Sequence, residues 1–463
     1  CVRSLLASRP DMQPGDSFLC NDPAQGGSHL PDLTVMTPVF DAAGAELQFV
    51  VASRAHHAEI GGLRPGSMYP FAKNLAEEGV IFRHEPMVKA GVFLEAEIRQ
   101  KLAEAAWPSR DPDSNLADLR GQLAANQLGV RALHQLVQEQ SWPVVAAYMG
   151  HIRETAEAYC RNAISQLQEG THGFSDLLDD GTPLKLTATI KAGHLKLDFS
   201  GTGAVRSDSL NANRAIVQSA VLYALRCLIS QPVPLNDGVL EAVDLHLPQC
   251  LLSPPVKESA HEAAAVVGGN VELSQKVVDL IFGTLGTCAA SQGTMNNLVF
   301  GNASYGFYET IGGGTGAGPD WDGTAAIHSH MTNTRLTDVE IMEKRYPVRV
   351  RTFAIRHGSG GGGTHQGGDG MIREIEFLEE TDVCLLTQRR LTQPYGLAGG
   401  ASGKSGCNLL IKPGVSPEKL PSLAVIKASP GDCLRIETPG GGGYGQKLFP
   451  STISDSKKSV TDI

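Results

Sequence analysis

The first part of the chain alternates between short apolar runs and polar clusters that favour turns. Three of the apolar runs have the length and composition of β-strands, and they lie at residues 16–19, 33–36 and 48–53. The clusters between them are rich in Asn, Asp, Pro, Gly and Ser, which mark chain reversals. The pattern predicts a β-rich segment over residues 1–92.

The apolar positions change to a helical period after residue 92. Ser114 is a candidate N-cap, and Trp142 with Pro143 restarts the pattern because proline is tolerated in the first helical turn. The first apolar stripe consists of Leu116, Leu119, Leu123, Val130, Leu133 and Val137, and the second of Val145, Tyr148, Ile152, Tyr159 and Ala163. The stripes predict an antiparallel helical hairpin within residues 93–175.

A period of two returns at residues 183–199 and predicts a β-hairpin. Two further helices are expected, at about residues 211–230 and 271–285, and strands alternate with loops beyond them. We therefore predict a mixed α/β fold with several subdomains: a β-rich part (1–92), a helical hairpin (93–175), a mixed α/β domain with glycine-rich loops (176–450) and a flexible tail (451–463).

Composition narrows the classes of protein that fit this pattern. The net charge is −10 and no Lys/Arg cluster stands out, so we expect no nucleic-acid partner. The longest apolar runs fall short of the ~20 residues that a membrane span needs, so we expect no membrane partner. The nine cysteines show no CxxC spacing, which fits reduced thiols in a cytoplasmic protein better than a disulfide framework.

Glycine is unusually frequent, with 52 residues and runs at 312–318, 358–370 and 440–445. None of these runs is a nucleotide-binding motif. Gly403-Lys404-Ser405 has Ala398 where a P-loop requires its first glycine, and the 312–318 run lacks a βαβ context. We expect no nucleotide site, and we expect the glycine runs to bind a substrate or partner through backbone amides or to form tight turns.

Two motifs bring imidazole and carboxylate groups together. His29 and Asp32 are three residues apart on a segment entered through two glycines, and His56 and His57 follow an apolar run with Glu59 close behind. Ligation by imidazole and carboxylate suits zinc, manganese or iron and leaves positions open for water and substrate. The alternative is that these histidines are structural, one buried and one solvated.

A third polar cluster covers residues 328–335 and does not have the pattern of a core strand. We expect it to line a polar cavity or interface, with four candidate substrate-binding residues: His328, His330, Asn333 and Arg335. The alternative is a solvated surface loop. Two smaller polar clusters lie at residues 308–310 and 388–390.

Several longer motifs resemble the hydantoinase B/oxoprolinase family. They lie at residues 21–32, 54–57, 66–68, 211–213, 291–297 and 439–445. Residues 308–347, which include the third polar cluster, are similar to the 5-oxoprolinase branch of that family. The resemblance covers about residues 10–445.

The resemblance implies an ATP-dependent cyclic-amide hydrolase that works in two halves. A partner ATPase half, actin-like in fold, would bind ATP and Mg²⁺ and phosphorylate the oxygen of a small lactam, which in this branch is 5-oxoproline. The present half would then open the activated ring to glutamate with a metal-activated water. The family's ligand positions match His29, Asp32 and His56 for a divalent Zn, Mn or Fe, while His57 and Glu59 are candidate catalytic groups.

The chain starts at Cys1, without an initiator methionine or a signal peptide. From the resemblance we expect a preceding segment to supply a strand and a further ligating carboxylate, and we expect a homodimer or larger oligomer. Family members usually carry aspartate at the position of Glu59, which is one methylene longer. These expectations predict that the chain alone does not turn over substrate.

Three alternatives stay open from the sequence. The chain could be the B subunit of a hydantoin or N-methylhydantoin hydrolase, which differs only in substrate. It could be an acetone-carboxylase-like α subunit, although residues 308–347 argue against that reading. It could also be an inactive, truncated scaffold that requires its ATPase half.

Overall fold

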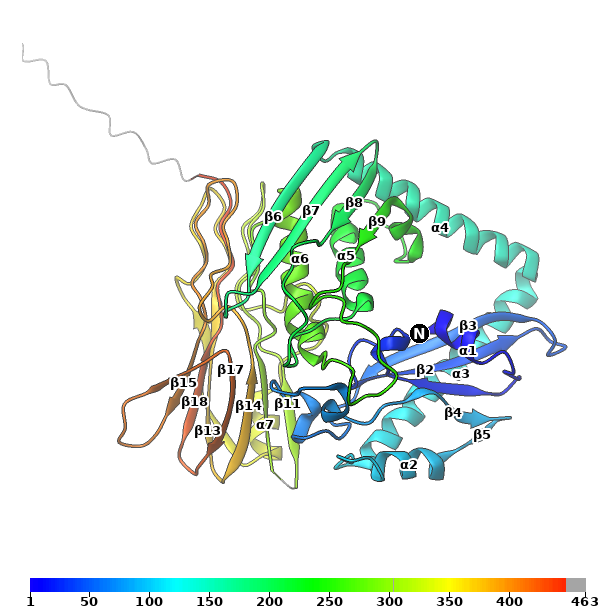
Figure 1. The fold of residues 1–463 in the computed structure, drawn as a ribbon, viewed down its shortest axis with the longest axis horizontal. Helices are drawn as coiled ribbons and strands as arrows, with labels where there is room; N and C mark the ends of the chain where they lie inside the picture. Colours follow the sequence, from blue (N-terminus) through cyan, green and yellow to red (C-terminus); the bar gives the residue numbers. More distant parts are fainter. Residues whose placement is uncertain (303, 447–463) are drawn as a thin grey trace, which may run out of the picture.

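The computed structural model describes residues 1–302 and 304–446, which form four β-sheets with helices packed between them. Figure 1 places the β1–β5 sheet at the lower right, the β6–β9 sheet at the top, and the C-terminal strands at the left. The mixed α/β class with several sheets confirms the predicted fold class. The division into domains stays a prediction, and the tail predicted at residues 451–463 lies outside the described residues.

The N-terminal sheet has the strand order β3-β2-β1-β4-β5, and neighbouring strands are antiparallel. Its strands are β1 (Ser17–Cys20), β2 (Asp32–Phe40), β3 (Leu47–His56), β4 (Arg83–Lys89) and β5 (Val92–Phe93), preceded by α1 (Val2–Ser8). The three predicted runs are therefore strands, longer than expected in β2 and β3. Three short 3-10 helices lie in the connections between these strands: η1 (Pro23–Gln25), η2 (Pro65–Ser67) and η3 (Leu75–Glu78).

The two predicted helices are α3 (Pro112–Gln140) and α4 (Trp142–Ser165), preceded by α2 (Glu95–Ala103). α3 covers one face of this sheet, whereas α4 packs against the sheet formed by the middle of the chain, so the two helices do not lie together as the predicted antiparallel hairpin. Gln122 and Asn126 of α3 donate hydrogen bonds to backbone carbonyls of β2 and β3, which fixes the helix on the sheet. The predicted N-cap at Ser114 is wrong, because Asp111 caps the helix and Pro112 occupies its first turn. The restart at Trp142 is confirmed.

The middle of the chain forms a sheet with strand order β6-β7-β8-β9, covered by two helices. These elements are β6 (Gly170–Leu177), β7 (Pro183–Lys191), β8 (His194–Asp198), β9 (Val243–His246), the 3-10 helix η4 (Asp237–Ala242), α5 (Arg214–Leu228), the π-helical turn η5 (Gly269–Leu273) and α6 (Ser274–Leu285). The predicted hairpin and both predicted helices are present. Asn213 caps α5 by accepting a hydrogen bond from the Ile216 amide, so α5 starts later than expected.

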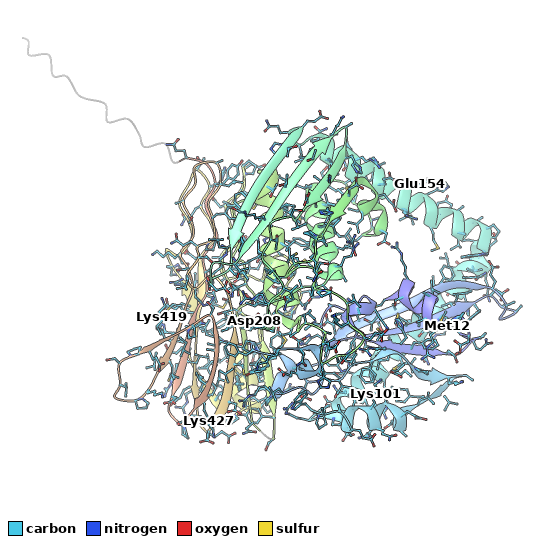
Figure 2. The ribbon with its side chains drawn as sticks, in the orientation of Figure 1. Met12, Lys101, Glu154, Asp208, Lys419 and Lys427 are labelled. Atoms are coloured by element: carbon cyan, nitrogen blue, oxygen red, sulfur yellow. The ribbon has the colours of Figure 1, made fainter. Side chains whose placement is uncertain are left out.

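Two C-terminal sheets enclose a second core built mainly from strand residues. Their strand orders are β11-β10-β14-β17 and β12-β13-β18-β15-β16. The elements are β10 (Asn297–Gly301), β11 (Gly306–Glu309), α7 (Val339–Arg345), β12 (Val348–Arg356), β13 (Gly370–Phe377), β14 (Thr381–Leu386), β15 (Cys407–Ile411), β16 (Glu418–Leu420), β17 (Leu423–Ala428) and β18 (Cys433–Glu437). Figure 2 shows Lys419 at the left and Lys427 at the lower end of these sheets.

The glycine-rich segments pack against one another in a bundle of extended chains, which Figure 1 shows standing side by side at the upper left. We call this the glycine bundle; its segments are residues 312–318, 359–368, 395–403 and 440–443. The amide of Gly441 donates to the carbonyl of Gly368 (2.9 Å), and that of Gly443 donates to Ala401 (2.9 Å). The backbone amides expected to bind a substrate are therefore used to hold the bundle together.

The glycines of residues 440–443 face three neighbouring segments of the bundle. A Cβ atom on Gly441 would lie 1.9 Å from the Thr315 carbonyl oxygen, and one on Gly442 would lie 1.9 Å from the Tyr395 carbonyl oxygen. Backbones can approach this closely only where no side chain stands between them. The abundance of glycine is thus a packing requirement.

Glu78 is a buried carboxyl group that should make stability depend on pH. Its Oε1 accepts from the Val267 amide at 2.8 Å, and burial raises its pKa from 4.5 to about 8. Because the folded pKa is the higher one, the stability that protonated Glu78 contributes is complete below pH 4.5 and is lost as the pH rises through 8. Glu78→Gln should remove on the order of 3 to 5 kcal/mol of this pH dependence.

Urea unfolding at pH 5 and pH 8.5 checks this prediction, with Glu97→Gln on the exposed face of α2 as the control. We expect the Glu78→Gln protein to lose less stability between the two pH values than the wild type and the control lose. Equal losses in all three proteins would show that Glu78 does not titrate in this range.

Two further sequence predictions concern the whole chain. All nine cysteines are free, in agreement with the absence of a disulfide framework. Among the helices of the described residues, none combines the length and apolar character that crossing a bilayer requires.

Candidate metal centre

A polar cavity of about 570 Å³ lies where the N-terminal sheet meets α5, η5 and β11. It combines residues from the two sequence motifs at 28–32 and 54–58 with residues from the polar cluster at 328–335 and its continuation to Thr337. The lining residues are Ser28, Asp32, Arg54, His56, Ala58, Ile216, Ser219, Asn270, Val271, Met295, Tyr308, Glu309, Thr310, Met331, Thr332, Asn333, Thr334, Arg335 and Thr337.

The pairing of β2 with β3 brings Asp32 and His56 together. The two residues are direct cross-strand partners in the antiparallel ladder, at the ends of their strands. Side chains of such partners stand on the same face of the sheet. His56 Nδ1 accordingly lies 3.2 Å from Asp32 Oδ1.

His29 reaches the same carboxylate from the turn before β2. The turn is closed by a hydrogen bond from the Asp32 amide to the His29 carbonyl (3.1 Å). The Asn213 side chain, at the start of α5, donates to the carbonyls of Gly27 and Ser28 and holds the turn in place. His29 is completely buried, and its Nδ1 lies 3.3 Å from Asp32 Oδ2.

Electrostatics favours a neutral imidazole and an ionised carboxylate at this position. Burial lowers the pKa of His29, against the opposing pull of Asp32. Burial would raise the pKa of Asp32, but the imidazoles of His29 and His56 hold it well below its usual range. Ser28 also donates a hydrogen bond to Asp32 Oδ2 at 2.5 Å. Neutral imidazole and ionised carboxylate are the protonation states in which these groups bind a metal.

The arrangement fits a divalent metal ion. One potential ligand atom from each of His29, Asp32 and His56 lies within 4.8 Å of the other two. His29 Nε2 is buried and has no hydrogen-bond partner among the described residues, and such a buried polar atom is costly unless something binds it. Two imidazoles and a carboxylate form a donor set suited to zinc, manganese or iron.

The structure places His57 and Glu59 outside the cavity lining. His57 is buried against α3, where its Nδ1 accepts from Asn115 (3.1 Å) and its Nε2 donates to Gln122 (3.3 Å). Glu59 accepts hydrogen bonds from the Arg110 guanidinium (2.7 Å) and amide (2.8 Å). With their polar atoms already bonded, both residues are better suited to holding the 57–62 segment on α3 than to the predicted catalytic roles.

The four predicted substrate-binding residues separate into two groups. Asn333 and Arg335 line the cavity that contains Asp32 and His56. His328 and His330 line a different and smaller cavity of about 260 Å³, and His330 Nε2 is bonded to the buried Asp279 at 3.0 Å. The structure thus places these four residues at two separate cavities, and their roles in substrate binding stay predictions.

Sequence reasoning did not single out two residues of the cavity wall. Arg54 lies two positions before His56 on β3, so the period of two could have placed it on the same face. Its Nε donates to Thr34 Oγ1 at 2.8 Å. Tyr308 belongs to a polar cluster that the sequence showed, but its position beside His56 depends on a sheet that starts more than 200 residues later in the chain.

The polar cluster at residues 388–390 has a structural role. Arg389 is almost completely buried and forms two hydrogen bonds to the carboxylate of Asp176 (2.9 and 2.7 Å). This pair joins the C-terminal sheets to β6, so the cluster connects parts of the fold.

Comparison with known proteins agrees with this fold. The chain is 44% identical to 5-oxoprolinase of Dictyostelium discoideum over 96% of this chain and 35% of that protein. It is 43% identical to 5-oxoprolinase 1 of Arabidopsis thaliana over 95% of this chain and 36% of that protein. The chain therefore spans about a third of the length of these curated relatives.

Two solved structures have the same fold. The ATP-dependent caprolactamase from Pseudomonas jessenii matches 96% of this chain and 80% of its own, with a TM-score of 0.85 and 22% identity. Nucleotide-free acetone carboxylase matches 96% of this chain and 66% of its own, with a TM-score of 0.83 and 17% identity. The Hydantoinase B/oxoprolinase family model matches residues 1–447. The chain is a member of the Hydantoinase B/oxoprolinase family.

Proposed function

We propose that this chain carries the hydrolytic centre of an ATP-dependent cyclic-amide hydrolase and that its substrate is 5-oxoproline, which is opened to glutamate. The observation that carries the proposal is the convergence of His29, Asp32 and His56 at a cavity that Asp32, His56 and Arg335 line. The family and the relatives called 5-oxoprolinase support the reaction class.

The reaction explains why ATP is needed. An unstrained amide is a poor electrophile, and phosphorylation of its oxygen makes the ring carbon more reactive. Water then adds to that carbon, the ring C–N bond breaks, and the nitrogen takes up a proton. The resulting acyl phosphate is hydrolysed by a second water, so lactam, ATP and two waters give the amino acid, ADP and phosphate.

The residues of this chain would hold the metal and the reacting groups. His29, Asp32 and His56 would ligate a divalent ion, which when bound lowers the pKa of water and polarises an electrophile. Ser28 fixes one oxygen of Asp32 by donating to it. Asn213 keeps the turn that carries His29 against α5, so the donor groups are positioned before any ligand arrives.

The charge of the cavity fits an anionic substrate. Glu309 is buried and paired with the Arg373 guanidinium at 3.1 Å, and Asp32 faces two imidazoles. Arg335 is exposed at the cavity and forms no ion pair with any acidic residue in the described part of the chain. We assign Arg335, with Asn333 beside it, to the carboxylate of 5-oxoproline, which a guanidinium can bind through two hydrogen bonds.

The ATPase activity belongs, in this proposal, to a second half or subunit. The relatives are about three times as long as the match, which leaves room for an actin-like ATPase part that binds ATP and Mg²⁺. A cytoplasmic location and assembly into homodimers or larger oligomers stay predictions. The likeness to acetone carboxylase, at 17% identity, concerns the fold.

The experiment mixes this chain with the ATPase half and measures 5-oxoproline-dependent ADP release, glutamate formation and metal content. We expect turnover only when both halves and a divalent ion are present. Arg335→Met should raise the KM for 5-oxoproline roughly 10- to 100-fold with a small change in kcat, because a hydrogen bond to a charged group contributes about 1.5–3 kcal/mol.

Caprolactam, which lacks the carboxylate, provides the matched substrate, and Lys419→Met on β16 provides the matched variant. Turnover of caprolactam, where measurable, should not depend on Arg335. An unchanged KM in Arg335→Met would overturn the assignment of that residue, and bicarbonate-dependent consumption of a ketone would favour the carboxylase alternative. Stable binding of the ATPase half without metal or turnover would favour the scaffold alternative.

A further inference from the structure

Three aromatic rings lie close together at the cavity. The His56 ring stacks on that of His29, with centroids 5.2 Å apart and an angle of 27°, and is tilted against that of Tyr308, with centroids 5.2 Å apart and an angle of 33°. Tyr308 comes from β11, so the C-terminal part of the chain supplies one of these rings. His56 thus has one aromatic neighbour from the N-terminal part of the chain and one from the C-terminal part.

The His56 ring needs these neighbours to hold it in place. Its side chain is about one-third exposed, and its one hydrogen bond among the described residues runs from Nδ1 to Asp32 at 3.2 Å. A single hydrogen bond leaves the ring some freedom to turn about its Cα–Cβ and Cβ–Cγ bonds. Two neighbouring rings restrict this motion and so fix the direction of the second ring nitrogen.

Tyr308 is itself fixed by a buried partner. Its hydroxyl donates to Asn297 Oδ1 at 2.9 Å, and Asn297 lies on the neighbouring strand β10. Asn297 is completely buried, and its Nδ2 donates to the Leu386 carbonyl (2.6 Å) and to Glu272 Oε1 (2.7 Å). The tyrosine ring therefore cannot swing away without breaking a buried hydrogen bond.

Glu272 in turn holds the Asn297 side chain by accepting its hydrogen bond. It belongs to η5, whose residues Asn270 and Val271 line the cavity, and its Oε1 also accepts from the Met295 amide at 3.1 Å. Burial raises the pKa of Glu272 to about 8, so at neutral pH the group is mainly a neutral carboxyl and adds little charge. A continuous chain of hydrogen bonds therefore links Glu272 on η5, through Asn297 on β10, to Tyr308 beside His56.

We infer that Tyr308 is a positioning residue that holds the His56 imidazole in the orientation in which it binds the metal, and that Asn297 and Glu272 anchor Tyr308 for this purpose. The inference rests on the proposed metal centre. It gives a role to two motifs, at residues 291–297 and 308–310, that the proposed reaction itself leaves unused.

The test titrates the full chain with Co²⁺ and records the visible absorption bands, which report ligand geometry. Tyr308→Leu, which removes the ring, should weaken Co²⁺ binding about 10- to 100-fold, the range for loss of a group that orients a ligand. Tyr308→Phe keeps the ring and should restore most of the affinity. Tyr305→Leu, in the same β10–β11 hairpin but packed against Phe300 and Tyr346, should leave binding unchanged.

A second measurement does not require the metal. The ring nitrogen signals of His56 in a ¹H–¹⁵N spectrum of the metal-free chain, assigned with His56→Gln, should shift or broaden in Tyr308→Leu and stay close to wild type in Tyr308→Phe. If the wild type binds no Co²⁺, the proposed metal centre fails while these signals still test Tyr308. Wild-type Co²⁺ affinity, or wild-type His56 signals, in Tyr308→Leu would overturn the inference.

Discussion

Asp32→Asn should abolish metal binding and turnover while leaving the fold intact. Asp32 faces both imidazoles, and its ionised state is favoured because they hold its pKa well below the usual range. An amide has nearly the same shape but carries no charge and offers one acceptor oxygen in place of two. Loss of a ligand should exceed the roughly 10- to 100-fold effect of losing a ligand's outer partner, so we expect activity to fall to background.

Metal content after dialysis and glutamate formation with the ATPase half check this result. Asp41→Asn is the matched control, because Asp41 caps the turn of the same β2–β3 hairpin through bonds to the Ala45 and Glu46 amides. That variant should bind metal and turn over substrate like the wild type. Retention of stoichiometric metal by Asp32→Asn would remove Asp32 from the ligand set.

Gly441→Ala should strongly destabilise the C-terminal part of the chain. The new Cβ would lie 1.9 Å from the Thr315 carbonyl oxygen and 2.2 Å from its carbon. Both atoms belong to the backbone of another segment, so no side chain can rotate away to make room. Overpacking of a core usually costs about 1–3 kcal/mol and occasionally more. Here we expect at least about 3 kcal/mol, a large part of the 5–15 kcal/mol by which domains are stable.

Denaturant unfolding and the yield of soluble protein check this prediction. Gly362→Ala is the matched control, since it lies in the same bundle yet a Cβ there would have no described atom of another segment within 4 Å. The control should behave like the wild type. If Gly441→Ala and Gly362→Ala were equally stable, the glycine bundle would not be the close-packed unit that its geometry indicates.

Local patterns were sufficient for most of the secondary structure. The stripe from Leu116 onwards and the restart at Trp142 predicted α3 and α4, because a helix that covers a sheet must bury one face. The helix start was wrong because Ser114 and Asp111 can both cap, and Pro112 decides between them by fitting the first turn. The choice between two possible N-caps depends on backbone geometry within one helical turn. The residue types alone do little to distinguish them.

The candidate site was predictable in part. His29, Asp32 and His56 stood out because imidazole and carboxylate groups recur at short spacing, and β2–β3 pairing brings them together. His57, one residue further along, turns to the opposite side and binds Gln122 and Asn115 of α3. Two residues that are adjacent in sequence at the end of a strand therefore need not belong to the same site, because successive side chains point to opposite sides.

The glycine runs and the polar cluster at residues 328–335 required the tertiary structure. A run of glycines has the same sequence whether it cradles a ligand or packs against other backbones, and only the bonds from Gly441 to Gly368 and from Gly443 to Ala401 show which. Within the polar cluster, the chain divides between two cavities, with His328 and His330 in one and Arg335 in the other.

The sequence by itself determined the period of the helices and strands, the glycine-rich composition and the His29, Asp32 and His56 donor groups. The tertiary structure decided which of these residues meet. Asn213 holds the turn of His29 across 185 residues of chain, and Tyr308 reaches His56 from a separate sheet. Local sequence encodes which face an element buries, whereas the partner of that face is fixed only when distant elements pack.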